Sequence, residues 1–234
     1  MNKALALGLA TVMLAAAFLI ASPAFAAEEE DPKAKDPNME VLDIKLPDPS
    51  FSGTPLDYWS EILELSFKPR PKYYVPKGTV LLSKDKPVTS SDVTVLPNKL
   101  KMVTDDVKKF EAEHVLNLKP GPQYIQIDLE KKCAIEAIVV WHFHEYERVY
   151  FDVAARVSND PEFKEGVEEL FNNDHDNSSK LGVGKDKEYV EKAEGKLIEG
   201  KGVQARYVRL YSNGNCNDDV NTYIEVQVFG KAVE

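Results

Sequence analysis

The feature that most constrains this fold is a pair of alternating apolar segments near the C-terminal end, residues 205–212 and 223–230. In the first segment Val208 and Leu210 share one face, and the apolar residues around Val226 alternate in the same way. Period-two alternation bounded by Asn, Gly and Asp is typical of half-buried antiparallel strands. The chain is therefore predicted to end as an all-β module, in which any chemistry lies in the loops.

The first 26 residues have the pattern of a secretory signal peptide. A basic start at Lys3 precedes an apolar run over residues 4–20, and Ala24 and Ala26 supply the small residues of a cleavage site after Ala26. The run is shorter than the ~20 residues that span a bilayer, and no cysteine near the cleavage point could carry a lipid anchor. We expect an exported protein, secreted or periplasmic, with no membrane insertion after the signal is removed.

The net charge bears on which partners the protein can bind, and the cysteine content bears on whether it contains a disulfide. The formal charge of −10 becomes −11 when Lys3 leaves with the signal. Nucleic-acid binding depends on Lys and Arg that neutralise phosphates, so we expect no nucleic-acid partner. The two cysteines, Cys133 and Cys216, form an even pair in an oxidising compartment, which favours a disulfide; two separate thiols are the alternative.

Residues 27–77 have the composition of an arm. Up to about residue 54 the sequence is acidic and rich in proline, which is typical of a flexible tether. Residues 56–65 carry apolar side chains at helical spacing and predict two turns of helix, and residues 68–76 predict an extended, proline-rich strap. The aromatic residues of this region either pack against the domain edge or dock a partner; they are Tyr58, Trp59, Tyr73 and Tyr74.

The domain itself is expected over residues 78–231. Its predicted strands are residues 79–82, 123–129, 134–142, 149–158, 167–172 and the two C-terminal segments. Residues 134–142 are almost continuously apolar, which indicates a central strand covered on both faces. A short helical piece is expected over residues 105–114. Several short strands separated by turns favour a β-sandwich over an α/β fold.

Four short motifs occur once each along the chain, in the order and at about the spacing found in one known family. They are Lys86-Pro-Val-Thr-Ser-Ser-Asp, Gln123-Tyr-Ile-Gln-Ile-Asp-Leu, Arg156-Val-Ser-Asn-Asp-Pro-Glu-Phe and Ala205-Arg-Tyr-Val-Arg-Leu-Tyr-Ser-Asn-Gly-Asn. Together they resemble the discoidin, or coagulation-factor type C, family of galactose-binding-like domains over residues 78–230. The resemblance implies a jelly-roll β-sandwich that binds carbohydrate or another surface ligand, commonly with a structural calcium ion, and without catalysis. A fold does not fix a ligand.

The resemblance also implies a place for the calcium ion. Family members often hold it between an acidic turn early in the domain and a Glu that opens the last strand, positions that Asp105 and Glu225 match. Asp106 stands where the family prefers Gly, and Val107 where a second acidic residue is common. Since calcium needs six to eight oxygens, the alternative is an exposed acidic turn with an outward-facing, salt-bridged Glu225.

A long polar loop over residues 172–186 is the second candidate site. Oxygen side chains alternate at Asp174, Asp176 and Ser178, as at the start of a calcium loop, but the glycine and the distal Glu of an EF-hand are absent. The loop either binds a ligand, with its amides and carboxylates on sugar hydroxyls, or satisfies itself through Asx turns.

The third candidate lies over residues 141–150. His142 and His144 are two apart on a strand and could chelate a metal, but no third ligand is evident. A cleft in which His144 and Arg148 bond a sugar is the favoured functional interpretation. The alternative is that the aromatic residues are core and Arg148 pairs with a carboxylate.

No motif of a known catalytic class is present, so no enzymatic activity is expected. Two hypotheses remain. In the first, the chain binds carbohydrate or another surface ligand through its loops, at His144, Arg148, Asn172, Asn173, Asp174, Asp176, Asn177, Asn213 and Asn215. In the second, it is a structural or assembly subunit that docks onto an exported protein partner through the sandwich and arm, with self-assembly open.

Overall fold

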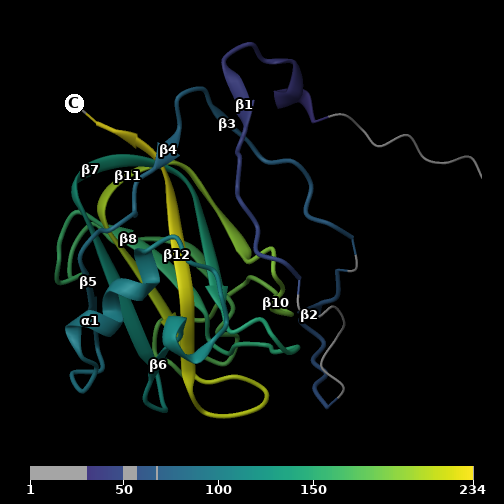
Figure 1. The fold of residues 1–234 in the computed structure, drawn as a ribbon, viewed down its shortest axis with the longest axis vertical. Helices are drawn as coiled ribbons and strands as arrows, with labels where there is room; N and C mark the ends of the chain where they lie inside the picture. The colour runs from purple at the N-terminus through teal and green to yellow at the C-terminus, as the bar shows by residue number, and fades with distance from the viewer. Residues whose placement is uncertain (1–30, 50–56, 67, 234) are drawn as a thin grey trace, which may run out of the picture.

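The computed structural model describes residues 31–49, 57–66 and 68–233. The predicted signal peptide and cleavage site lie outside the described residues. Within the described ranges, no helix is long and apolar enough to cross a membrane. Most of the regular structure is β-strand, and Figure 1 shows the strands gathered into one sandwich with the arm along its side.

Two long strands, β7 (Gln123–His142) and β11 (Lys196–Ser212), bend and enter both layers of the sandwich. The first half of β7 and the second half of β11 form one layer together with β5 (Val88–Ser90), β8 (Ala154–Ser158) and β9 (Glu168–Asn172). The second half of β7 and the first half of β11 form the other, with β12 (Asn221–Ala232), β6 (Leu116–Leu118) and β4 (Val80–Leu81). The predicted all-β jelly-roll sandwich is confirmed.

The remaining elements are short. The arm contributes β1 (Met39–Val41) and β3 (Tyr74–Pro76), which pair with each other, and β2 (Leu63–Glu64), which pairs in parallel with β10 (Glu188–Tyr189) of the domain. The helical pieces are α1 (Pro97–Leu100) and 3₁₀ turns over Pro32–Lys35, Lys101–Thr104 and Ala112–His114.

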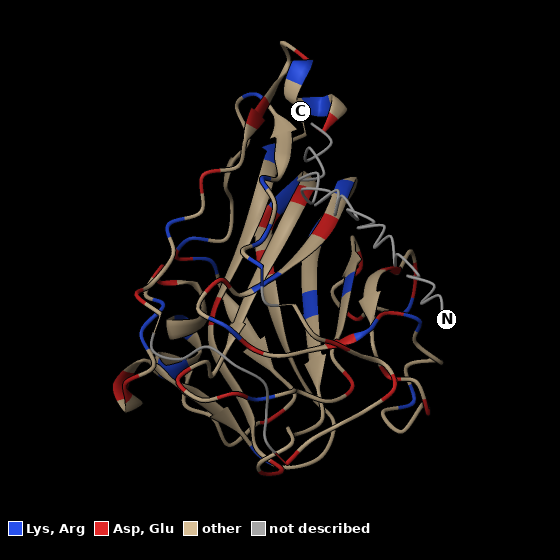
Figure 2. Cartoon of the chain, turned by 90° about the vertical axis from the view of Figure 1, so that its right-hand side faces the viewer, with Lys and Arg blue, Asp and Glu red and all other residues tan. Residues whose placement is uncertain are grey.

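Alternation along the strands builds the core between the layers. Ile125 and Ile127 of β7 point inward, as do Val226 and Val228 of β12, and all four are fully buried. Figure 2 shows Lys and Arg interspersed with Asp and Glu along the strands and loops. A few charged side chains, among them Lys108, Asp174 and Glu225, are nevertheless buried.

A second apolar cluster lies on the outer face of the second layer. Val139 and Trp141 of β7 face outward there, yet both are fully buried, because Leu42, Ile44 and Tyr73 of the arm pack over them. The continuously apolar run of residues 134–142 is explained by this double covering. Of the two expectations for the strap, packing against the domain is the one observed for Tyr73.

Trp141 sets a local requirement on the chain opposite it. Its indole Nε1 donates to the Ala193 carbonyl at 2.9 Å, and a Cβ on Gly195 would meet the indole at 2.7 Å. Gly195 also has φ of +66°, a conformation that favours glycine. Two independent reasons therefore hold a glycine just before β11.

Two predicted helices differ from the structure. Among the described residues of the 56–65 segment, residues 57–62 form turns and Leu63–Glu64 pair with β10, because a partner strand outweighs weak helical spacing. Residues 105–114 contain only the Ala112–His114 turn as helix. The strands predicted separately at 123–129 and 134–142 are the single strand β7.

The predicted disulfide is wrong, since Cys133 and Cys216 are both free thiols. Cys133 lies opposite Ala232 at one end of β12, whereas Cys216 lies in the loop before Asn221 at the other end. A strand of this length separates the two sulfurs by on the order of 30 Å, and a disulfide needs Cα atoms within about 7 Å.

Covering by the arm predicts the behaviour of one substitution. Val139→Asp should lower the free energy of unfolding by several kcal/mol or prevent folding, because it places an unpaired carboxylate on a face that has no water. Val93→Asp, at a position that is 87% exposed, should change it by no more than about 0.5 kcal/mol. Urea unfolding measures both. Equal stability of the two variants would mean that the arm leaves the outer face open.

Candidate binding site

The loops at one end of the sandwich carry most of the predicted site residues. β7 and β9 end there, at His142 and Asn172, and β8 and β12 begin there, at Ala154 and Asn221. Backbone hydrogen bonds tie the loops together, from Asn173 to the Val153 carbonyl at 3.0 Å and from Asn213 to the Phe151 carbonyl at 2.9 Å. The loops therefore form a connected polar surface at the lower end of the sandwich in Figure 1.

A cavity of about 330 Å³, here called the Asn173 pocket, opens among these loops. It is lined by Ile62, Phe151, Asp152, Asn173, His175, Asp176, Ser178, Glu188 and Asn213. Three of the predicted ligand-binding residues, Asn173, Asp176 and Asn213, thus meet in one cavity.

Asn173 is a buried polar residue of this pocket that has unused hydrogen-bonding capacity. Its side chain is almost completely buried, at 3% exposure. Oδ1 accepts the Val153 N–H at 2.6 Å, which fixes the orientation of the amide. Nδ2 has no hydrogen-bond partner within the described structure. Since an unpaired buried donor costs about 1–3 kcal/mol, the pocket favours a ligand that brings an acceptor to Nδ2.

Asp152, which the sequence reading missed, organises the floor of the pocket. Its Oδ2 accepts the Ser178 hydroxyl at 2.6 Å, the Ser179 hydroxyl at 2.7 Å and the Asn213 amide at 2.8 Å. It joins the 143–153 loop to two other loops. The sequence indicates this role only by an Asp in a short connection between strands. The φ of +51° at Asp152 is visible only in the structure.

Three carboxylates gather beside the pocket, from Asp152, Asp174 and Asp176, with one oxygen of each within 4.8 Å of the others. This group contains two of the three predicted loop ligands. Ser178 takes a different role from the one predicted, because its hydroxyl donates to Asp152. Burial, and next the charge of Asp152, raise the pKa of Asp174, while the Ser178 N–H lowers that of Asp176.

The other predicted loop residues shape the loops. Asn172 donates to the Gly182 carbonyl at 3.2 Å, and Asn177 accepts the Gly182 N–H at 2.7 Å. Asn215 donates to Asp218 and to the Val220 carbonyl. These bonds are the Asx-type turns that were the alternative to ligand binding.

Arg148 and His144 lie apart from the Asn173 pocket. Arg148 lines a second cavity of about 640 Å³, where its guanidinium lies 4.7 Å from the Phe143 ring centre and 3.3 Å from the Asp218 carboxylate. His144 is buried, with Nε2 at 3.1 Å from the Lys108 carbonyl. His142 contacts Glu191 at 2.6 Å, so the two histidines bond different partners.

The arm supplies one wall of the Asn173 pocket. Tyr58 donates to the Glu188 carboxylate at 2.8 Å, and its ring centre lies 5.3 Å from that of Phe151. Ile62 lines the cavity directly. Removing the arm would therefore alter the pocket, and the arm cannot be treated as a separate module.

The residues expected to hold the family's calcium ion have another arrangement. Glu225 lies opposite Trp141 on the outer face of β12, yet it is 1% exposed and accepts the Asp106 N–H at 3.0 Å, so the exposed, salt-bridged alternative is wrong. The ammonium of Lys108, also buried, lies 2.7 Å from Asp106 and 5.3 Å from the Trp141 ring centre. Among described residues, Asp105 and Glu225 gather with no third His, Cys, Asp or Glu as a metal-ligand group. A lysine cation already neutralises this corner, so its residues do not fit a calcium ion.

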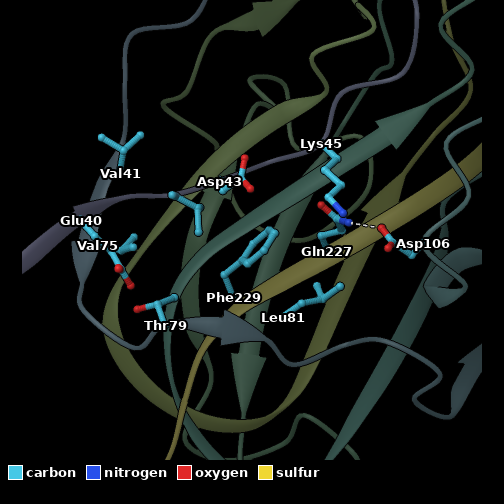
Figure 3. Close-up of a pocket in the computed structure, with 11 residues that line it drawn as sticks. Glu40, Val41, Asp43, Lys45, Val75, Thr79, Leu81, Asp106, Gln227 and Phe229 are labelled. Atoms are coloured by element: carbon cyan, nitrogen blue, oxygen red, sulfur yellow. Dashed lines mark hydrogen bonds between the residues drawn. The ribbon is translucent and has the colours of Figure 1, made fainter.

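A third cavity, of about 390 Å³, lies between the arm and β12 next to this corner. Figure 3 shows Glu40, Asp43 and Lys45 of the arm on one side and Gln227 and Phe229 of β12 on the other. The Gln227 amide donates to Asp106 at 2.6 Å, the bond drawn as a dashed line. Asp106 is thus held from two directions, by Gln227 and by Lys108.

No model of a known protein family matches the chain, and no protein of curated function matches its sequence. Membership of the discoidin family therefore stays a prediction. Among solved structures, the chain is similar to a truncated AlyQ with CBM32 and alginate lyase domains (16% identity, 67% of this chain, TM-score 0.45), and spans only 34% of that chain.

Two similar structures are single modules. They are the Streptococcus pneumoniae fucose binding module SpX-3 (13% identity, 64% of this chain and 96% of that one, TM-score 0.44) and Clostridium perfringens CpGH89CBM32-4 in complex with GlcNAc-alpha-1,4-galactose (15%, 67% and 97%, TM-score 0.44). The scores lie below 0.5, so the fold rests on the strand pairing described above.

Glu225 predicts a measurable pH dependence. Burial raises its pKa from 4.5 to about 9, so the folded state binds a proton that the unfolded state releases, and stability falls as pH rises from about 4.5 to about 9. Glu225→Gln keeps an acceptor for the Asp106 N–H and removes the titration. Its stability should decline less between pH 5 and pH 8 than that of the native chain, as measured by urea unfolding.

The exposed substitution Glu162→Gln serves as the control and should leave the native pH profile unchanged. A Glu225→Gln protein that is destabilised at pH 8, and only when calcium is present, would return Glu225 to the role of metal ligand.

Proposed function

We propose that the protein is a non-catalytic, extracytoplasmic module that binds carbohydrate in the Asn173 pocket. The observation that carries this proposal is the buried Asn173 Nδ2, which lacks a partner in a cavity otherwise rich in acceptors. A sugar hydroxyl is both donor and acceptor, so one hydroxyl can accept from Nδ2 and donate to a neighbouring carboxylate.

The remaining lining also suits a sugar. The Phe151 ring and Ile62 supply apolar surface for a C–H face, and the Asp176 carboxylate and the Asn213 amide supply polar contacts around it. The volume, about 330 Å³, is at the small end of ligand sites, which favours a single sugar unit or the end of a chain. The resemblance to discoidin domains and the predicted signal peptide point to the same function and setting.

One observation favours docking of an exported protein as the second function. Trp59 is 76% exposed on the arm, and Leu46 and Leu65 are about half exposed. An exposed tryptophan supplies a large apolar surface of the kind that anchors protein contacts. Because the arm also forms a wall of the pocket, deletion of the arm does not separate the two functions; Trp59→Ser does, since it should reduce partner capture and spare sugar binding.

Asn173→Asp tests the carbohydrate proposal. The variant keeps Oδ1 for the Val153 N–H, replaces the free donor by an acceptor and adds a negative charge. Binding to an array of immobilised mono- and oligosaccharides should fall at least about tenfold, since a hydrogen bond to the ligand is lost and an acceptor is left facing it. Asn159→Asp makes the same chemical change at an exposed position beyond the far end of β8 and should bind as the native chain does.

Thermal unfolding of each variant shows whether it is folded. If Asn173→Asp does not fold, Asp176→Asn, at an exposed position, replaces it. Sugar binding that is unchanged in a folded Asn173 or Asp176 variant would overturn the assignment of this pocket.

A further inference from the structure

We infer that Asp152, Asp174 and Asp176 hold a calcium ion that bridges the protein to hydroxyls of the bound sugar. The inference rests on the proposed function, because the ligand that completes the ion's shell is the sugar in the Asn173 pocket. It concerns a different place from Asp105 and Glu225, where the Lys108 ammonium supplies the positive charge.

The first argument is the balance of charge. One oxygen from each of the three carboxylates lies within 4.8 Å of the others. Their hydrogen-bond donors in the described structure are neutral: the N–H groups of Ser178 and Ser179, their hydroxyls and the Asn213 amide. None of the ion pairs between described residues involves any of the three. Carboxylates this close, two of them buried, repel one another unless a proton or a cation lies between them. The raised pKa of Asp174 marks the strain of this arrangement, and a divalent cation relieves it for all three carboxylates at once.

The second argument is independent of the first and comes from Asn173. Asn173 lines the same cavity as Asp152 and Asp176, and its Nδ2 is buried and has no partner in the described structure. An N–H donor cannot bind a cation. It can bind an oxygen that the cation holds in place, because a coordinated hydroxyl keeps a second lone pair for Nδ2 and a proton for a carboxylate.

The carboxylates and the Asn173 amide need different partners. A cation alone leaves Nδ2 without an acceptor, and a neutral sugar alone leaves the carboxylates without a counter-charge. A cation with a hydroxyl-bearing ligand satisfies both groups. A free polyol and a sugar both carry neighbouring hydroxyls that could complete the ion's shell, so the binding experiment must compare the two.

The arrangement of the ligands favours calcium over smaller ions. Asp174 is fully buried, Asp152 is almost buried and Asp176 is exposed, so the ion would be enclosed by protein on one side and open toward the cavity. Three carboxylates supply three to six oxygens, which leaves positions for two neighbouring hydroxyls within calcium's six to eight. The Ser178 N–H already orients Asp174 and Asp176, at 3.0 and 2.9 Å, so little ordering is needed on binding.

Calcium binding is measured first, without any sugar. Calorimetric titration of calcium chloride into the chelator-treated mature chain should show one site with a Kd of about 10⁻⁵–10⁻³ M, and magnesium chloride should bind more weakly. Asp176→Asn should weaken calcium binding at least about tenfold through the loss of one charged ligand. Asp219→Asn, a matched change at an exposed Asp of a neighbouring loop, should not, and neither should Glu225→Gln.

Sugar binding is measured next, on beads that carry galactose, fucose or N-acetylglucosamine, with glycerol-coated beads as the polyol control. Retention should be lost in chelator and restored by calcium, and Asp176→Asn should lose it. Asn173→Asp adds a carboxylate, so it should bind calcium at least as tightly as the native chain and still lose the sugar. Equal retention on glycerol beads would show polyol binding and overturn the sugar as the completing ligand.

The failures are distinguishable. A chain that does not bind calcium, or whose calcium binding survives Asp176→Asn, overturns the ion site whatever the sugar result. Calcium binding at Asp176 combined with chelator-resistant retention of sugar overturns the bridge and leaves the carbohydrate function intact. Calcium binding with no retention on any bead overturns both the bridge and the proposed function for these sugars.

Discussion

Burial of the second half of β7, residues 137–142, on both faces is the constraint on which the rest of the structure depends. Its inner face forms the core with β12, and its outer face, at Val139 and Trp141, would meet water if the arm did not cover it. A strand segment can be apolar on both faces only when a third layer covers the outer one. The arm is that layer, although its described residues contain only three short strands. Trp141 in turn requires a glycine at position 195, where the chain enters β11. The arm and the start of β11 therefore both pack against this one indole.

The sandwich places its polar groups at one end. The loops there are joined by backbone bonds and by Asp152, which accepts three side-chain hydrogen bonds from residues of two other loops. Loops that are cross-linked in this way and begin on packed core strands can hold carboxylates close together. At the acidic turn of Asp105 and Asp106, the negative charge is instead balanced within the protein, by the buried ammonium of Lys108 beside Asp106.

The main strands could be predicted because alternation of apolar residues is a local property, as at Val208 and Leu210. Long-range partners could not. The segment at Leu63 has the spacing of a helix and becomes a strand because β10 lies beside it, and Cys133 and Cys216 form an even pair that the length of β12 keeps apart. The same holds for the candidate site: residues with a local signal could be predicted, and residues placed by long-range contacts could not.

Asn173 and Asp176 stand in a loop whose composition indicates binding, and they meet in the pocket. Asp152 has no such signal, since its role depends on a turn at positive φ. Arg148 and His144, grouped with the loop by sequence proximity, face other neighbours. Glu225 faces outward as strand alternation indicates, but it is buried because the turn at Asp106, which is distant in the sequence, lies against it.

The arm wall of the pocket has a thermodynamic consequence. Ile62 lines the pocket only when the arm is docked, through the Tyr58–Glu188 bond and the β2–β10 pairing. A ligand that touches Ile62 must therefore favour the docked arm, and by reciprocity a docked arm must favour the ligand by the same factor. Any force on the N-terminal end of this chain, from a tether or a bound partner, would then register as a change in affinity at the far end of the sandwich.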